Sequence, residues 1–259
     1  MSVPTDTKGA RKEEAVLLRG AKAHMAESVA QRKDERPITG WRVYLPLIGS
    51  SVGLVVLVFL IIWLGSWQAV VVGYFFLYTI ASAFVVVLNY LLVKGFVVHA
   101  RREAMLRRGA IEYLRATASA RGMSATIEGE MSNLESIERD ATNTERMPSS
   151  LYTAFGALPL VGIFVTLYYL KALDTVPIAH GRRWAAFVQQ VSSAGTKLGL
   201  ASKIRSAPAK GGNRFLPFAI VTLILPPFLV LWYYMLLKEN ARHLQSQAND
   251  EDSVLQLLA

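Results

Sequence analysis

Four apolar blocks alternate with charged stretches along the chain, at about residues 43–67, 69–93, 151–170 and 215–237. Each block has roughly the 20 residues that a helix needs to cross the hydrocarbon core of a bilayer. Strands are excluded there because lipid cannot satisfy the backbone groups of an open sheet. The pattern therefore predicts an all-α polytopic integral membrane protein with about four transmembrane helices and cytoplasmic helical extensions.

These blocks divide the chain into five segments. We expect a polar N-terminal segment at 1–40, a transmembrane hairpin at 41–93, a charged helical region at 94–150, a second transmembrane pair at 151–237 with a basic loop at 171–214, and a C-terminal tail at 238–259. Pro159 should bend the third span, and Pro226 and Pro227 should kink the fourth.

The polar regions also have helical periodicity. Residues 9–36 predict an amphipathic helix with a thin apolar face, for which a solvated tail is the alternative. The helix of the second span should continue to about Ala120, and an acidic helix over 127–146 should pack antiparallel against its basic part. A further amphipathic helix is expected over 184–205.

Charge predicts the orientation. The chain has 28 Lys and Arg against 19 Asp and Glu, with nine of the basic residues in 1–42 and nine in 94–150. The positive-inside rule therefore places the N-terminus and 94–150 in the cytoplasm, and four spans return the C-terminus there too. Residues 171–214, with eight basic residues, would then break the rule by lying outside.

Two arrangements resolve this conflict. In the first, the third segment is re-entrant, which keeps 171–214 inside and sends the tail outside. In the second, the third segment crosses the membrane and 171–214 is a genuine outer basic loop. We favour the genuine loop because four segments of full length are present.

The ends of the second and fourth spans repeat one another. A tyrosine, a lysine four residues later and a histidine five residues after that occur in both, at Tyr90, Lys94, His99 and at Tyr234, Lys238, His243. This predicts two parallel hairpin repeats, 41–120 and 151–259, with a pair of histidines at the cytoplasmic interface. The alternative is a chance match between the aromatic and basic anchors that commonly end a span.

Basic side chains near the spans are predicted to contact lipid headgroups or a partner protein. They are Arg101, Arg102, Arg107, Arg108, Arg182 and Arg183. Stacking aromatic residues are scarce around the basic stretch, so no nucleic acid is expected as a partner.

Most signs of catalysis are absent from the sequence. The chain has no cysteine, which excludes thiolate chemistry, and no pair among its histidines has metal-binding spacing. The apolar blocks contain no Asp, Glu, Lys, Arg or His, although ion-coupled transport generally needs them. We expect no catalytic residues, no metal ligands and no cofactor.

The leading hypothesis is a non-enzymatic, multi-pass protein of the cell membrane, an accessory, scaffolding or assembly subunit of a membrane complex. Its partners would be a bilayer with anionic headgroups and other membrane subunits or further copies of itself. A small transporter or channel with proline-kinked helices is one alternative. A lipid-acting membrane enzyme with His99 and His243 at headgroup level is another.

Overall fold

The computed structural model describes residues 7–35, 45–65, 67–144, 146–158, 161–200, 204, 206, 214–224 and 228–258. These residues form helices and short connections without any strand, so the predicted all-α fold is confirmed. The α-helices are α1 (Thr7–Gln31), α2 (Leu45–Leu64), α3 (Trp67–Ala120), α4 (Glu128–Thr144), α5 (Val161–Lys197), α6 (Phe215–Ile224) and α7 (Phe228–Leu258). The short 3-10 helices are η1 (Arg32–Asp34), η3 (Ser124–Ile127) and η4 (Ser150–Ala157).

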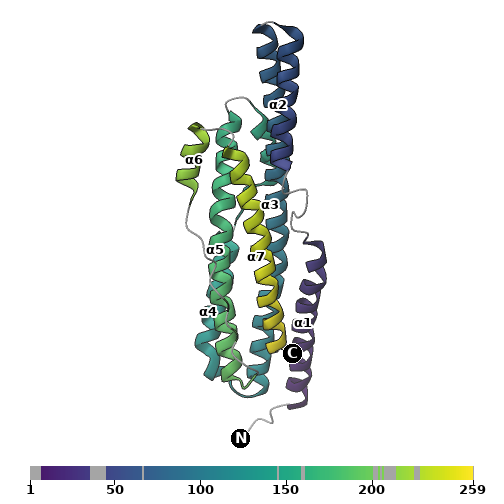
Figure 1. Cartoon of the computed structure of the whole chain (residues 1–259). Coiled ribbons are helices and arrows are strands. Elements are labelled where there is room, and N and C mark those ends of the chain that lie inside the picture. The colour runs from purple at the N-terminus through teal and green to yellow at the C-terminus, as the bar shows by residue number, and fades with distance from the viewer. Residues whose placement is uncertain are drawn as a thin grey trace.

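Three long helices, α3, α5 and α7, run side by side in the same direction and form the body of the molecule (Figure 1). We call the end where α2 meets α3 the apolar end, and the opposite end of α3 the polar end. Two other helices run against α3 near the polar end. Glu135 and Glu138 of α4 pair with Arg115 and Arg107, and Ser28 of α1 donates a hydrogen bond to the carbonyl of Arg102.

The helices α3 and α7 pack with a constant offset of 144 residues. Tyr233 donates a hydrogen bond to Asn89 (2.8 Å) and Gln247 donates one to Glu103, and both pairs are 144 residues apart. This is also the offset of the repeated Tyr, Lys and His positions in the sequence. The two helices are therefore in register over at least 15 residues, from Asn89 to Glu103 on α3.

Side chains buried in the centre of α5 recur at alternating steps of three and four residues, as in a coiled coil. They are Leu170, Leu173, His180, Trp184, Phe187, Val191 and Ala194, and the half-buried Pro177 divides the one step of seven, between Leu173 and His180, into four and three. The hydrophobic core forms two clusters along the bundle. The upper cluster surrounds Leu88, Tyr169 and Tyr233, and the lower cluster surrounds Leu114, Phe187 and Leu257. Polar side chains occupy the level between the two clusters.

Several predicted helices are confirmed. The helix of the second span continues without a break to Ala120, as expected. The acidic helix is α4, which pairs Glu135 and Glu138 with α3. The N-terminal segment is helical from Thr7 to Gln31. The amphipathic helix expected over 184–205 is confirmed only from Trp184 to Lys197, where α5 ends and the chain turns at Gly199, whose φ is 67°.

The structure differs from the expected four spans at the third and fourth segments. Residues 151–170 contain η4 and the start of α5, which lie antiparallel, since Tyr169 donates a hydrogen bond to the carbonyl of Ser149. Residues 215–237 contain α6 and the start of α7, which also lie antiparallel: Phe218 packs edge-on against Phe228 (5.1 Å), whereas Arg214 pairs with Glu239. Each segment is a helical hairpin, so neither is a single spanning helix.

The prolines expected to bend the third and fourth spans, Pro159 and the pair Pro226 and Pro227, lie outside the described residues. They fall in the intervals between η4 and α5 and between α6 and α7. The expected loop at 171–214 is largely helical, because α5 continues to Lys197.

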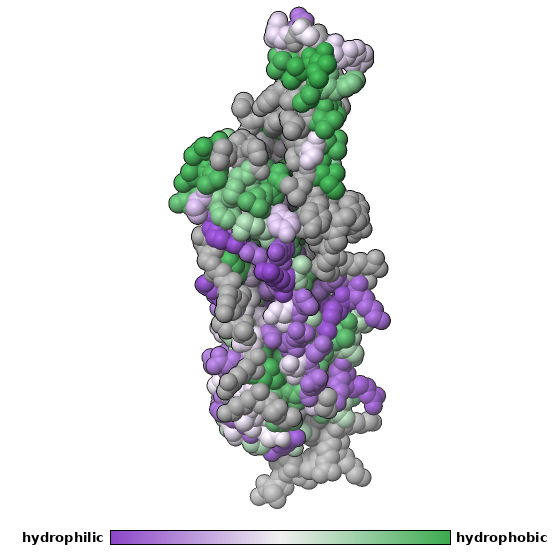
Figure 2. All heavy atoms as spheres, in the orientation of Figure 1, coloured by the Kyte–Doolittle hydropathy of each residue, from purple (hydrophilic) through white to green (hydrophobic). Residues whose placement is uncertain are grey.

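Exposed apolar side chains gather at the apolar end, over α2, the start of α3, α6 and the start of α5. Figure 2 shows this region in green above a predominantly purple lower part. Within the described part of the chain, the stretches Ser82–Ala120 and Val161–Lys197 are long and apolar enough to cross a membrane, by length and composition alone.

Close packing of α1 against α3 depends on one glycine. A Cβ atom at Gly109 would lie 2.9 Å from Cγ of Met25 and 3.1 Å from the carbonyl oxygen of Ala21, whereas Gly95 of the same helix has nothing within 4 Å. We predict that Gly109→Ala destabilises the protein by about 1–3 kcal/mol. The matched Gly95→Ala should be neutral or stabilising by up to about 1 kcal/mol, through helix propensity.

Unfolding in detergent followed by circular dichroism measures both variants. Limited proteolysis should cut α1 faster in Gly109→Ala only. Equal effects of the two variants would show that α1 does not pack closely at this position.

Candidate functional site

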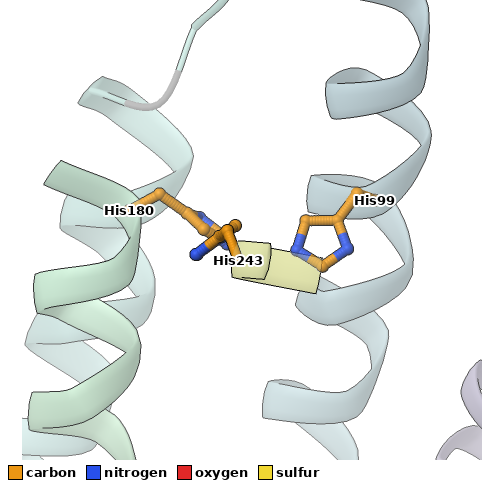
Figure 3. A group of neighbouring side chains, drawn as sticks. All are labelled: His99, His180 and His243. Atoms are coloured by element: carbon orange, nitrogen blue, oxygen red, sulfur yellow. The ribbon is translucent and has the colours of Figure 1, made fainter. Parts of the chain in front are cut away.

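Three histidines meet at the level between the two hydrophobic clusters. His99 comes from α3, His180 from α5 and His243 from α7, and one ring nitrogen of each lies within 4.8 Å of the others. The ring centroids are 5.3 to 5.9 Å apart. Figure 3 shows the three side chains pointing toward one another from their separate helices. We call this group the histidine layer.

The histidine layer is shielded from solvent. His99 is 2% exposed, His180 is 0% exposed, and His243 is half-buried. Register explains why the three residues meet. His99 and His243 have the 144-residue offset at which α3 and α7 pack, and His180 occupies a central position of α5. The same packing that buries leucines above and below therefore buries an imidazole from each helix at this level.

Glu103 is the main acidic group beside the layer. It is 0% exposed, and its Oε2 lies 2.6 Å from Nε2 of His180 and 3.6 Å from Nε2 of His99. It also pairs with Arg107 and accepts a hydrogen bond from Gln247. Burial raises the pKa of the Glu103 carboxyl, but His180 and Arg107 outweigh burial and hold that pKa well below its usual range.

A second carboxylate reaches the layer from the N-terminal part of the chain. Glu35 follows η1, and its Oε2 lies 3.1 Å from Nδ1 of His99 while its Oε1 accepts a hydrogen bond from Arg102 (2.5 Å). Burial raises the pKa of Glu35, but the hydrogen bonds from His99 and Arg102 together outweigh burial, so the pKa is lowered. The other nitrogen of His99 lies 2.9 Å from Oε1 of Gln247. Both ring nitrogens of His99 thus face oxygen atoms.

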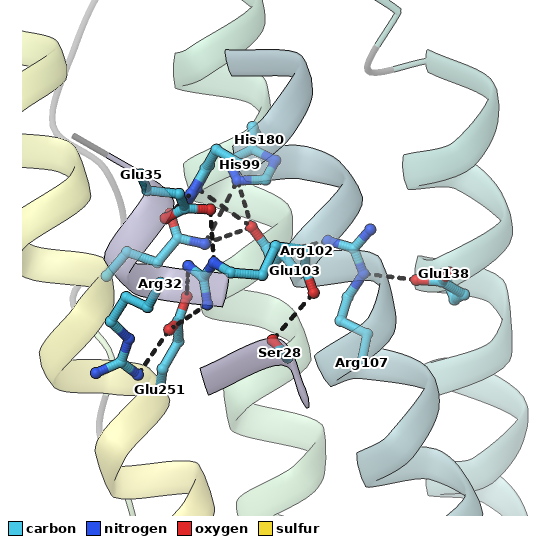
Figure 4. Close-up of polar contacts among 11 residues, drawn as sticks. Ser28, Arg32, Glu35, His99, Arg102, Glu103, Arg107, Glu138, His180 and Glu251 are labelled. Carbon is cyan, nitrogen blue, oxygen red and sulfur yellow. Dashed lines mark hydrogen bonds and ion pairs between the residues drawn. The ribbon is translucent and has the colours of Figure 1, made fainter. Parts of the chain in front are cut away.

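An ion-pair network continues from the layer toward the polar end (Figure 4). Arg102 makes two parallel hydrogen bonds to Glu251 (2.7 and 2.8 Å). Arg32 pairs with the same carboxylate (2.8 Å), and Arg107 pairs with Glu138 on α4 (2.5 Å). The network therefore joins η1, α3, α4 and α7, and its central groups Arg102, Arg107 and Glu251 are buried.

A small cavity of about 20 Å³ lies on the apolar side of the histidine layer. Its lining consists of Leu92, Phe96, Leu173, Pro177, Leu236 and Asn240. Such a volume has room for roughly one water molecule. The layer therefore lies beside a space too small for an organic substrate.

The repeated residues found in the sequence occupy equivalent places on α3 and α7. Lys94 lies over the ring of Tyr90 at 5.5 Å, and Lys238 lies over Tyr234 at 5.8 Å. The two histidines of the repeat are neighbours, with ring centroids 5.9 Å apart. His99 is buried inside the bundle and does not lie at a headgroup surface, where the lipid-enzyme alternative requires it.

The six arginines predicted to contact lipid or a partner divide into two groups. Arg101, Arg108 and Arg182 are exposed and Arg183 is half-buried. For Arg102 and Arg107 the prediction is wrong, because they are 2% and 3% exposed and pair with glutamates inside the protein. A run of arginines usually indicates a solvated face, and here one side of the run turns inward toward acids from other helices.

Sequence reasoning missed His180 and both carboxylates of the layer. A metal-binding spacing is recognisable only within one segment, whereas these histidines come from three helices more than 60 residues apart in sequence. One signal was present: His180 lies on the steps of three and four residues that also bury Trp184 and Phe187. A histidine on such an apolar stripe requires polar partners from neighbouring helices.

The chemistry of the layer is that of a cation site. Imidazole nitrogens bind protons and transition metals, and adjacent carboxylates favour positive charge. No match to a protein family, to a curated protein or to a solved structure was found for this chain. The geometry and the sequence therefore carry the functional argument alone.

The ion-pair network predicts a large difference between two neighbouring arginines. Arg102→Ala would remove the buried cation between Glu251 and Glu35, leaving Arg32 beside the first and His99 beside the second, and should cost about 3–5 kcal/mol of unfolding free energy. Arg101→Ala changes an exposed side chain and should stay within about 0.5 kcal/mol of wild type.

Denaturant titration in detergent, followed by tryptophan fluorescence, compares the two variants. A cost for Arg102→Ala no larger than that for Arg101→Ala would contradict the buried network.

Proposed function

We propose that the chain is a membrane-anchored, non-enzymatic scaffold whose charged helical bundle lies wholly on the cytoplasmic side. In this proposal the α2–α3 hairpin crosses the bilayer. The η4–α5 and α6–α7 hairpins enter from the cytoplasmic side to about half depth and return. The observation that carries the proposal is the distribution of the 28 lysines and arginines.

Every lysine and arginine lies in residues 1–42, 94–146, 171–214 or 238–242. If 151–170 and 215–237 each crossed the bilayer once, residues 171–214 and their eight cations would lie outside. With two returning hairpins, all four cationic regions lie on one side and the positive-inside rule is obeyed throughout. This resolves the conflict in a way that neither sequence-based arrangement anticipated.

Helix lengths agree with half-depth entry. The apolar part of α5 before Lys171, and that of α7 before Lys238, each have ten residues. At 1.5 Å per residue they reach about 15 Å, half of the roughly 30 Å hydrocarbon core. The 20 residues of α2 reach about 30 Å and are long enough to cross.

Boundary residues support the same depth. Tyr90 with Lys94 and Tyr234 with Lys238 lie at one level, because α3 and α7 are in register. Tyr168 and Lys171 mark the corresponding part of α5. Aromatic and basic side chains of this kind favour the headgroup region. Only 33% of the most apolar window of α3, and of α5, is buried, and lipid is the natural cover for the remainder.

The water-exposed bundle offers a surface for a protein partner. A groove of about 400 Å³ between α3 and α4 is lined by alternating charges, including Arg108, Glu112, Arg115, Glu135 and Arg139. The buried ion pairs beside it should keep this groove rigid. A rigid, mixed-charge surface suits specific protein contacts better than binding to a uniformly anionic membrane.

Cysteine accessibility tests the topology, since the native chain has no cysteine. Single cysteines are placed at exposed positions: Gln68 at the start of α3, Ala186 on α5 and Ser246 on α7. An impermeant maleimide should label Gln68→Cys in intact cells. Ala186→Cys and Ser246→Cys should react only after the membrane is opened.

Labelling of Ala186→Cys but not Ser246→Cys in intact cells would contradict the returning hairpins and restore four spans. Release of the protein by alkaline carbonate would contradict membrane anchoring itself.

A further inference from the structure

We propose that His99, His180 and His243 bind one divalent transition-metal ion of the zinc class, with Glu103 as the fourth ligand. This inference goes beyond the scaffold function and does not depend on the membrane topology. It rests on three imidazoles in one layer and on the carboxylates that surround them.

The donor set suits zinc, cobalt or nickel. Imidazole nitrogen is a preferred ligand of these ions, whereas magnesium and calcium require oxygen. Zinc bonds to histidine nitrogen at 2.0–2.1 Å, which in a tetrahedral site separates the nitrogens by about 3.3 Å. In the structure the three nitrogens lie within 4.8 Å of one another. Small side-chain rotations, without backbone movement, can close a gap of about 1.5 Å.

The surrounding groups already orient one of the rings. Glu35 contacts Nδ1 of His99, so the Nε2 atom of that ring faces the centre of the bundle. In zinc sites a ligating histidine commonly donates its outer N–H to a carboxylate, which fixes the orientation of the ring. Glu35 lies in the corresponding place beside His99, although the two residues are 64 positions apart in sequence.

Glu103 is placed to complete the coordination. Its Oε2 lies close to the inward Nε2 atoms of both His180 (2.6 Å) and His99 (3.6 Å). In the structure this oxygen lies beside the same nitrogens that would bind the ion. Metal binding would replace these contacts by bonds to the ion and would release any proton that they share.

Burial indicates a structural metal ion and not a catalytic one. His180 and Glu103 are both 0% exposed, and the adjacent cavity of about 20 Å³ admits roughly one water molecule. A closed four-ligand site without room for a substrate is typical of structural zinc. The ion would join α3, α5 and α7 at one point.

Metal binding to the full chain, purified in detergent with an affinity tag that contains no histidine, tests the proposal. After removal of metal by a chelator, calorimetric titration with Zn²⁺ should give one ion per chain, and Co²⁺ should give the visible absorption of tetrahedral coordination. His180→Ala and His243→Ala should lose this binding. Glu103→Gln should weaken it by about 10–100-fold.

The chain supplies its own control. His24 is the one remaining histidine, and it pairs with Glu112 outside the layer. His24→Ala should bind Zn²⁺ with unchanged stoichiometry and affinity. Wild-type protein without a tetrahedral Co²⁺ spectrum would overturn the proposal, and so would equal losses of binding in His24→Ala and His180→Ala.

Folding is checked separately. If His180→Ala does not fold, the conservative variant His180→Gln is used in its place, because glutamine keeps a polar group in the layer. Excess Zn²⁺ should raise the unfolding temperature of wild type and His24→Ala, and leave that of folded His180→Gln unchanged, because only the native site binds the ion. An equal rise in all three proteins would contradict a site at the layer.

Discussion

The structure depends on the buried polar level that Glu103 occupies between two apolar clusters. A carboxylate with no exposure is tolerated only when its charge is compensated, and here His180 and Arg107 provide that compensation. Sliding α5 or α7 by one turn would separate Glu103 from His180 or from Gln247. Leucine-rich packing above and below would accept such a shift more easily. The polar level therefore selects the register, and register in turn brings the three histidines together.

A second constraint acts at the other end of the molecule. Apolar side chains cover the exposed surface there, whereas every lysine and arginine lies in the segments outside the four apolar blocks. Helices that turn back at half depth satisfy both facts without moving a charged segment through lipid. On this account the parallel direction of α3, α5 and α7 is a consequence of topology. All three helices enter the charged bundle from the same face, and the returning partners η4 and α6 are short and apolar.

The sequence predicted what local patterns encode. The continuous helix to Ala120 and the charge pairing of α4 followed from periodicity and from opposite charges at helical spacing. The repeat of Tyr, Lys and His contained the 144-residue offset at which α3 and α7 pack. The hairpins at 151–170 and 215–237 were missed because length and hydropathy do not distinguish one long helix from two short antiparallel ones. His180 and the burial of Arg102 were missed because both depend on partners that only the tertiary fold supplies.

The central claim is that α3 and α5 run in parallel on the same side of the membrane. Pulsed electron–electron resonance measures it directly on a cysteine-free chain carrying nitroxides at Arg101→Cys and Arg182→Cys, two exposed positions near the level of His99 and His180. Packed neighbouring helices predict a separation clearly shorter than the hydrocarbon core, below about 30 Å. A distance well above about 30 Å would place residues 101 and 182 on opposite faces of the bilayer and would contradict the account.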